Sequence, residues 1–201
     1  MKALVVATRN RGKTAEIGAI LRAQGIEADL RALWDYPGAP EISEDGGTFV
    51  ANAVKKARAA AMFTGEVAVA DDSGLVVDAL GGQPGVMSAR FGGPGLTDRE
   101  RYERLLALMR DVPGPARTAR FICAVAVATP EGLIGVAEGS CEGTIAWEPA
   151  GEGGFGYDPV FIFAGSGKTF GQLDEATKNR VSHRARAFEK AIPLIREGLG
   201  L

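Results

Sequence analysis

The chain has 201 residues, of which 46% are hydrophobic and 24% are charged, and its formal net charge at pH 7 is -2. These values describe an ordinary globular protein of one domain, and the balanced charge argues against a general nucleic-acid or membrane-surface partner. The two cysteines have no metal-ligand spacing, and the first residues resemble neither a signal peptide nor a membrane span, so we expect a cytoplasmic protein.

The first half of the chain alternates between short apolar runs and helical patterns. The apolar runs predict strands at 3–7, 28–33 and 67–70. Amphipathic spacing predicts one helix that follows the 8–13 loop and ends near 25, and another that runs from 48 to about 63. Thr48 can cap the second helix, whose apolar face is expected to contain Phe49, Ala53, Ala60 and Phe63. This alternation predicts an α/β fold.

The second half predicts a hairpin and three further helices. An apolar run covers 75–80, and Thr97-Asp98-Arg99-Glu100 is a capping box that begins a helix. Runs at 120–129 and 133–147 predict a long hairpin, and poor alternation at 122–128 indicates burial on both faces. A strand at 157–163, a short helix at 174–180 and a last helix at 182–197, which contains Pro193, complete the chain. The hairpin makes the predicted sheet mixed.

The functional interpretation depends on the stretch Ala68-Val69-Ala70-Asp71-Asp72-Ser73-Gly74-Leu75. Two adjacent carboxylates beside a core strand repel each other and are costly to bury unless a cation is present. Mg²⁺ prefers one or two carboxylates and completes its shell with water and substrate phosphates. Asp, Ser and Gly are also ordinary turn residues, so this stretch alone is compatible with a magnesium site or a turn. Both interpretations place a strand end or bend here.

Two basic features of the first half have both a functional and a structural interpretation. The loop Thr8-Arg9-Asn10-Arg11-Gly12-Lys13 leads into a helix, whose backbone amides could hold a phosphate or could simply form a turn. Lys56 and Asn52 lie beside the apolar face of their helix. Such a lysine either extends to solvent or meets an anion, and the spacing alone favours extension to solvent.

Two later stretches are also candidates. Phe155-Gly156-Tyr157-Asp158 could stack on a nucleobase, or form a structural turn. Lys178, Ser182, His183 and Arg184 flank the start of the last helix, where hydrogen-bond donors suit a keto oxygen or a phosphate, although a lone histidine is more often structural. Gly165-Ser166-Gly167-Lys168-Thr169 is not a phosphate-binding loop, because Ile162 stands where the pattern requires glycine.

Five segments together resemble the non-canonical purine nucleoside triphosphate pyrophosphatases, the inosine triphosphatase or Ham1-like family. They are ATRNRGK at 7–13, GGTFVANAVKKA at 46–57, ADDSGLVVDALGGQPGVMSARF at 70–91, FGYDPVF at 155–161 and KNRVSHR at 178–184. The resemblance implies an elongated mixed β-sheet flanked by helices in two lobes with a central cleft, formed by residues 1–201 as a single domain. It also implies a homodimer that hydrolyses ITP, dITP and XTP to the monophosphate and pyrophosphate with Mg²⁺.

The resemblance implies roles for individual residues. Asp72 is expected to be the general base or a metal carboxylate, supported by Asp71, with Glu44 as second metal ligand and Lys56 as a catalytic cation that binds phosphate. The expected substrate contacts are Thr8, Arg9, Asn10, Arg11, Gly12, Lys13, Ser73, Phe155, Gly156, Tyr157, Asp158, Lys178, His183 and Arg184. The sequence departs from the family pattern at Arg9 and Ala51, and Asp45 adds an acid beside Glu44, so either acid could be the outer ligand.

Two other functions are considered beside this one. A Maf-like pyrophosphatase acting on pyrimidine or modified nucleotides has a serine- and arginine-rich N-terminal pattern, unlike ATRNRGK. A non-enzymatic nucleotide- or nucleic-acid-binding module fits poorly, since the paired carboxylates would repel phosphate without a metal. The resemblance therefore favours a small-molecule substrate, and neither a nucleic acid nor a membrane is expected as partner. The sequence does not predict the preference among ITP, dITP and XTP, or how GTP is rejected.

Overall fold

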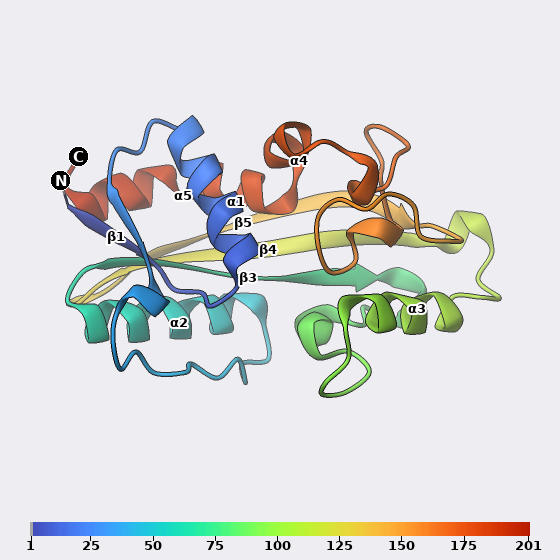
Figure 1. Cartoon of the computed structure of the whole chain (residues 1–201), viewed down its shortest axis with the longest axis horizontal. Coiled ribbons are helices and arrows are strands. Elements are labelled where there is room, and N and C mark those ends of the chain that lie inside the picture. Colours follow the sequence, from blue (N-terminus) through green and yellow to red (C-terminus); the bar gives the residue numbers. More distant parts are fainter. Residues whose placement is uncertain (1) are drawn as a thin grey trace. The chain divides into compact units, whose positions relative to one another are not determined.

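The computed structural model describes residues 2–201, which form an α/β fold with a mixed six-stranded sheet. The strands are β1 (Ala3–Val6), β2 (Asp29–Ala32), β3 (Val67–Val77), β4 (Thr118–Thr129), β5 (Gly132–Ile145) and β6 (Phe161–Phe163). The α-helices are α1 (Arg11–Ala23), α2 (Phe49–Thr64), α3 (Asp98–Leu108), α4 (Glu175–Val181) and α5 (His183–Leu199). Figure 1 shows these elements in chain order by colour.

The strand order is β2-β1-β3-β4-β5-β6. Strand β1 pairs in parallel with β2 and β3, whereas β5 and β6 are antiparallel, which confirms the predicted mixed sheet. The chain divides into two compact units. The first unit contains the chain up to Asp72, Cys123–Gly139 and His183–Leu201, and the second contains Ser73–Ile122 and Ser140–Ser182. The three long strands β3, β4 and β5 therefore contribute residues to both units.

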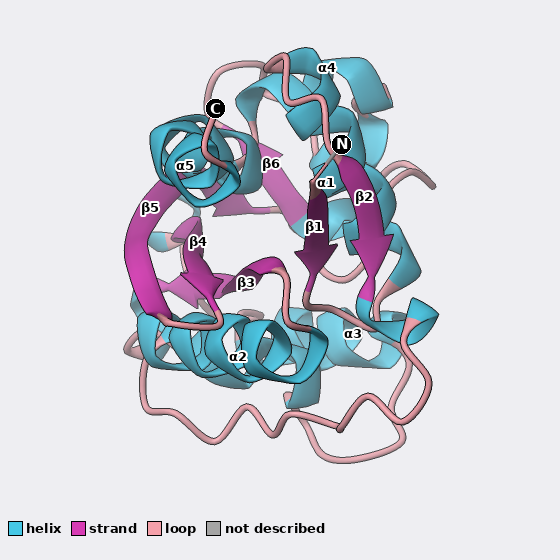
Figure 2. Ribbon diagram, turned by 90° about the vertical axis from the view of Figure 1, so that its left-hand side faces the viewer, coloured by secondary structure: helices cyan, strands magenta, loops and turns pink. Residues whose placement is uncertain are grey.

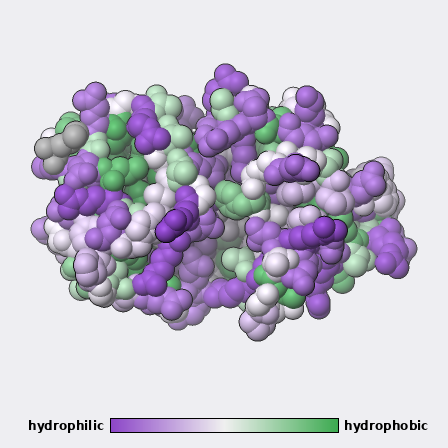
Figure 3. Space-filling model, viewed as in Figure 1, coloured by the Kyte–Doolittle hydropathy of each residue, from purple (hydrophilic) through white to green (hydrophobic). Residues whose placement is uncertain are grey.

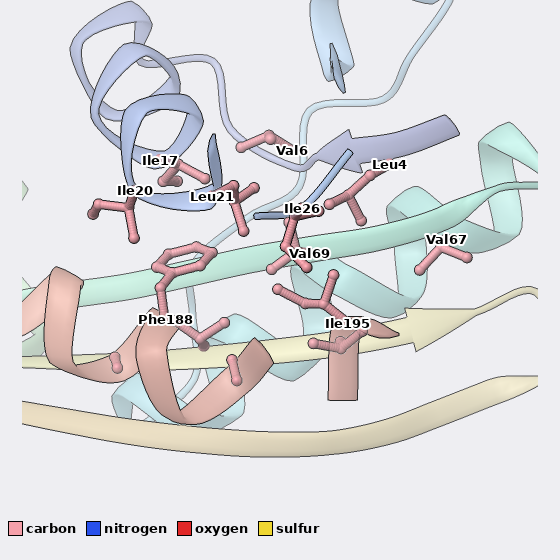
Figure 4. Close-up of a cluster of buried hydrophobic side chains, with 14 of the residues drawn as sticks. Leu4, Val6, Ile17, Ile20, Leu21, Ile26, Val67, Val69, Phe188 and Ile195 are labelled. Carbon is pink, nitrogen blue, oxygen red and sulfur yellow. The ribbon is translucent and has the colours of Figure 1, made fainter. Parts of the chain in front are cut away.

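Strands β3 and β4 of the first unit carry valines and a cysteine on one face and alanines on the other. The larger ones, such as Val69 and Val125, pack with α1 and α5 through residues that include Ile17 and Phe188 (Figure 4). The alanines of the strands pack against an alanine stripe on α2, which contains Ala53, Ala57, Ala60 and Ala61. Helix α2 thus covers one face and α5 the other (Figure 2). Because both faces are buried, β4 shows little alternation of polarity, as predicted.

Three helices begin at side-chain caps, of which Thr48 and Thr97 were predicted, whereas α1 begins at Arg11, inside the predicted 8–13 loop. The side chain of Asn10 accepts a hydrogen bond from the backbone N–H of Lys13 at the start of α1. Thr48 caps α2 in the same way, and Thr97 and Glu100 form the predicted capping box of α3. These side chains satisfy backbone N–H groups that have no partner within the helix. The helix that carries Lys56 and the loop that leads to Lys13 are therefore fixed locally by sequence.

Three predictions about the elements are wrong. Strand β3 does not end or bend at the paired aspartates but continues to Val77, so 75–80 is not a separate strand, and Asp78–Leu80 is a 3-10 helix. Only Phe161–Phe163 of the predicted 157–163 strand is extended, since Asp158–Val160 is a 3-10 turn around Pro159, which has no N–H to donate to a sheet. Phe63 is 43% exposed because it lies about 200° around α2 from the buried Ala61.

The second unit is organised around an aromatic cluster. The ring centroid of Phe161 lies 4.7 Å from that of Phe121 and 5.0 Å from that of Phe170. Leu105 and Met109 of the α3 region belong to the same buried group. Residues 164–168 form an exposed turn after β6, followed by a three-residue 3-10 helix, which agrees with the rejection of a phosphate-binding loop there.

The surface shown in Figure 3 is mostly hydrophilic, with hydrophobic residues in small scattered patches. Within residues 2–201, every helix is too short or too polar to cross a membrane.

Gly139 of β5 allows the close approach of α5. A Cβ atom at this position would lie 2.4 Å from the backbone N of Ala187 and 2.5 Å from the carbonyl O of His183. We expect Gly139→Ala to lower the free energy of unfolding by about 1–3 kcal/mol, because strand and helix must separate. Urea unfolding measures the effect, with Gly114→Ala as control, since a Cβ atom there meets no atom within 4 Å. Equal urea midpoints for both variants would contradict the prediction.

Candidate functional site

The two adjacent aspartates project to opposite faces of the sheet. Because β3 is extended through both residues, successive side chains point to opposite faces of the sheet. Asp71 therefore shares a face with Val69, and Asp72 shares the other face with Ala70. Asp71 therefore lies on the face covered by α1 and α5, and Asp72 on the face covered by α2. The predicted strand end at this pair is corrected here, and the two acids contact different residues of the first unit, although the charge of Asp71 also acts on Lys56.

Asp71 is held by cations from α1 and α5. Its Oδ2 atom lies 3.2 Å from Lys13 Nζ and accepts hydrogen bonds from Arg184 Nε at 3.1 Å and Nη2 at 2.9 Å. The third nitrogen, Nη1 of Arg184, donates to Glu16 Oε2 at 2.6 Å. Asp71 and Arg184 are each 1% exposed, so the charges meet in a place that water barely reaches.

This pairing keeps Asp71 ionised. Burial alone would raise the pKa of Asp71, but the positive charges of Lys13 and Arg184 outweigh it and hold the pKa well below its ordinary range. Burial would lower the pKa of the Arg184 guanidinium, but the carboxylates of Asp71 and Glu16 outweigh it and raise that pKa. Asp71 therefore carries a fixed negative charge that positions Lys13, the last residue of the basic loop.

Asp72 belongs to a second group, formed with residues of α2 and the loop before it. Its Oδ2 atom accepts a hydrogen bond from Asn52 Nδ2 at 2.8 Å, and its Oδ1 atom lies 4.0 Å from Lys56 Nζ. The ammonium group of Lys56 donates to Glu44 Oε1 in a short hydrogen bond. Lys56 is 7% exposed, so it meets an anion instead of extending to solvent. The preference for a solvent-extended Lys56 that spacing alone gave is corrected.

The second group has a different balance of charge from the first. Burial raises the pKa of Asp72, and although Lys56 and the Asn52 hydrogen bond oppose it, the nearby carboxylate of Glu44 adds to it. Burial would lower the pKa of Lys56, but the carboxylates of Asp71 and Glu44 outweigh it and raise that pKa. The carboxylates of Glu44 and Asp72 thus share the one ammonium group of Lys56. Of the two aspartates, Asp72 has the less stabilised ionised form.

The two acids of the loop before α2 separate in space. Glu44 reaches Lys56, whereas Asp45 is bound by Lys55 Nζ at 2.7 Å, in a pair whose side chains are 41% and 69% exposed. The pKa of Asp45 is lowered by this hydrogen bond with Lys55. The geometry therefore favours Glu44 over Asp45 as the partner of Asp72.

The Glu44–Asp72 pair fits a divalent cation of the magnesium type. No group of three or more His, Cys, Asp or Glu side chains among residues 2–201 is arranged to enclose a metal. Two carboxylates that share one ammonium leave an excess of negative charge, which a cation would offset. Mg²⁺ takes one or two carboxylates and completes its shell with water and phosphate oxygens, so the residues present suit it better than they suit a metal with an all-protein cage.

The basic side chains of the 8–13 segment point in two different directions. Lys13 faces Asp71, but Arg9 donates to the carbonyl O of Ala39 at 2.8 Å, and Arg9 and Arg11 line a separate hollow of about 450 Å³ with Trp34 and Tyr36. Thr8, Asn10 and Gly12 surround the start of α1, where Thr8 Oγ1 accepts from the Asn10 N–H at 3.2 Å. Of this loop, Lys13 is the side chain that the structure brings to the buried carboxylates.

The Phe155–Asp158 loop and Lys178 meet in the second unit. Asp158 Oδ2 accepts from Phe155 N at 2.8 Å and from Lys178 Nζ at 2.7 Å, and this ammonium lies 4.7 Å from the Phe155 ring centroid. A Cβ atom at Gly154 would lie 2.0 Å from Asp158 Oδ2, so only glycine permits this turn. Asp158 and Lys178, each under 10% exposed, thus build the loop around one aromatic ring.

Other expected ligand contacts of the second unit have structural partners. The Tyr157 hydroxyl donates to the carbonyl O of Ser88 at 2.9 Å, and its ring is in the core at 4% exposure. Gly156 has a φ of 62° and its N–H donates to Asp98 Oδ2 at 2.8 Å. Tyr157 is therefore a core residue, and the ligand contact expected of this loop stays a prediction. Ser73 lies in β3, partly exposed, as the first residue of this unit.

The start of α5 places two buried residues of the predicted site side by side. His183 is 5% exposed at the first position of the helix. Each of the three nitrogens of the Arg184 guanidinium donates to Asp71 or Glu16, and the substrate contact expected of Arg184 stays a prediction. Neither Glu16 nor the contacts of Asn52 were predicted from the sequence. The spacing of Glu16 from Lys13, three residues apart on α1, was the signal that placed both on one helix face.

The fold and these two groups define a class: an α/β protein whose basic loop and buried carboxylates suit a phosphorylated ligand and a divalent cation. The sequence model of the Ham1 family matches residues 4–194. A dITP/XTP pyrophosphatase of Desulforamulus reducens is 51% identical over 192 residues, which cover 96% of this chain and 94% of the relative. A dITP/XTP pyrophosphatase of Geobacillus kaustophilus is 50% identical over 190 residues, which cover 94% of this chain and 92% of that relative.

The fold comparison agrees with the sequence comparison. The structure of a HAM1 protein from Coxiella burnetii superimposes with a TM-score of 0.87 at 38% identity, covering 98% of this chain and 100% of that one. This chain belongs to the Ham1 family, as the five motifs predicted.

Proposed function

We propose that this protein is a nucleoside triphosphate pyrophosphatase, which hydrolyses non-canonical purine nucleotides such as dITP and XTP to the monophosphate and pyrophosphate. The observation that carries the proposal is the group of buried Asp72 and Lys56 with half-buried Glu44 on the α2 face. Asp71 lies on the other face of the same strand and is paired there with Lys13 of α1. The names of the relatives, similar over nearly the whole chain, supply the substrate class. A nucleic acid or a membrane is not a proposed partner.

The residues of the first unit have distinct roles in this proposal. Lys13 and Lys56 bind phosphate oxygens and offset the charge that develops on the pyrophosphate leaving group. Asp72 positions a water molecule for in-line attack on the α-phosphorus and accepts its proton. Asp71 stays ionised and holds Lys13 in place. Positioning and electrostatics then account for most of the rate, as is usual for phosphoryl transfer.

Glu44 and Asp72 would hold the proposed Mg²⁺. When bound, the ion supplies a positive charge to the phosphate oxygens of the substrate. We assign recognition of the base to three residues. In the second unit, Phe155 offers a ring face and Lys178 offers an ammonium group beside it. In the first unit, His183 offers a hydrogen-bond donor at the start of α5. A cytoplasmic location and a homodimer are also proposed, from the family resemblance.

A substrate panel with and without EDTA tests the function. We expect pyrophosphate release from dITP, ITP and XTP to exceed that from ATP and TTP by more than about 10²-fold, because buried donors reject a base without the 6-keto group. Chelation should abolish turnover, and excess Mg²⁺ should restore it. Preference for TTP would instead support a Maf-like enzyme. Absence of turnover with every triphosphate would support a binding module and overturn the proposal.

The choice between the two loop acids has its own test. We expect Glu44→Gln to raise the Mg²⁺ concentration needed for half-maximal turnover of dITP by about 10–100-fold, since one of two charged ligands is lost. Asp45→Asn is the matched control on the neighbouring residue, and it should change that concentration by less than about twofold, because Asp45 faces Lys55 at the surface. The reverse ranking would assign the metal to Asp45.

A further inference from the structure

Asn52 is the buried polar residue that joins two parts of the second charge group. It lies in the first turns of α2 and is 1% exposed. Its Nδ2 atom donates to Asp72 Oδ2 at 2.8 Å, and its Oδ1 atom accepts from the backbone N–H of Gly46 at 2.7 Å. Because the Gly46 N–H is a donor and a carboxylate is an acceptor, both ends of the amide are satisfied in this orientation.

The contact with Gly46 fixes the loop that carries Glu44. Gly46 is two residues after Glu44, and a Cβ atom there would lie 2.7 Å from Asn52 Oδ1 and 3.0 Å from the Cβ of Ala51. Glycine therefore lets the loop backbone approach α2 closely enough for this hydrogen bond. A second link between loop and helix, from Lys55 to Ser43 and Asp45, is exposed and therefore contributes little.

Other side chains cannot make both contacts from this position. An aspartate would accept at both ends and repel Asp72, a serine is too short to span them, and an alanine would leave the Gly46 N–H without its acceptor. Asparagine is also a weaker helix former than alanine, so local propensity does not explain it in an alanine-rich helix. The residue type is explained by the two contacts.

We propose that Asn52 is a positioning residue, which ties the Glu44 loop to Asp72 and so sets the separation of the two carboxylates. This inference rests on the function proposed above and deepens it. Asn52 touches neither substrate nor water in the reaction; it fixes the direction of Asp72 Oδ1 toward Lys56 by occupying Oδ2, and it holds Glu44 through Gly46.

The test uses three variants of the full chain and two measurements. Asn52→Leu removes both contacts with a side chain of similar size, and Gly46→Ala disrupts the loop contact from the other partner. Lys55→Gln is the matched control, because it removes the exposed link from the same helix. Hydrogen exchange of the Gly46 amide, measured in the protein without metal or nucleotide, reports the tie itself. Steady-state kinetics with dITP then reports its effect on turnover and on the Mg²⁺ requirement.

We expect Asn52→Leu and Gly46→Ala to speed exchange of the residue 46 amide at least about tenfold and to lower kcat about 10–100-fold, with less than threefold change in KM. Lys55→Gln should leave exchange and kcat within about twofold. Unchanged exchange in Asn52→Leu, or faster exchange with unchanged kcat, would overturn the inference. If Asn52→Leu does not fold, Gly46→Ala decides alone. If the unmodified protein hydrolyses no triphosphate, the proposed function fails, and the exchange data still decide whether Asn52 anchors the loop.

Discussion

Asp72→Asn should reduce kcat for dITP hydrolysis by about 10³-fold while the nucleotide still binds. The amide is nearly the same shape as the carboxylate, and its oxygen can still accept from Asn52 Nδ2. It cannot accept a proton from water, and removal of a general base usually costs 10²- to 10⁴-fold. The loss of a charged metal ligand adds to this effect. Lys13 remains held by Asp71 on the other face, so phosphate binding is retained.

Two measurements separate the chemical step from binding in this variant. Pyrophosphate release gives kcat, and calorimetry with dITP gives the dissociation constant, which should change by less than about tenfold. Asp78→Asn is the matched control, because that aspartate is 45% exposed and pairs with Arg120 instead of with Lys56 or Asn52. Turnover of Asp72→Asn within tenfold of the unmodified protein would exclude Asp72 as the base.

Most of the elements could be predicted because their signals are local. The caps Asn10, Thr48 and Thr97 mark helix starts through hydrogen bonds within four residues, and these signals need no knowledge of the fold. Burial of β4 on both faces was also visible, as an apolar run without alternation. The alternation that does exist is one of size: valine on the α5 face and alanine on the α2 face.

The site was less predictable, because its contacts join residues far apart in the chain. A strand rarely continues through two acids and a Ser-Gly, and β3 does so only because Lys13, Arg184 and Lys56 come from three other elements. Those partners could not be assigned from spacing, so a strand end was the reasonable interpretation. The ion pair of Arg184 could not be predicted for the same reason: nothing near it in sequence shows that Glu16, 168 residues away, is its partner.

Arg184→Met should be the most destabilising of these substitutions. The substitution removes the cation that pairs with both buried carboxylates, those of Asp71 and Glu16. Of the ion pairs described for Asp71, the one with Lys13 remains. Removal of one partner from a buried ion pair costs about 3–5 kcal/mol, since the other charge stays without compensation. Urea unfolding at pH 8 should show a loss of this size. Arg120→Met, which breaks a pair at 36% and 45% exposure, is the matched control and should cost less than about 1 kcal/mol.

The pH dependence of the Arg184→Met effect identifies its cause. In the unmodified protein the pKa of Asp71 is depressed, so its contribution to stability is complete above its ordinary pKa of about 3.9 and is lost only as pH falls below that value. Without Arg184, burial raises the pKa of Asp71, and protonation then relieves the folded state. The difference from the unmodified protein should therefore shrink by about 1 kcal/mol or more between pH 8 and pH 5. A difference independent of pH would mean that Arg184 stabilises by packing alone, and that Asp71 does not depend on it for its charge.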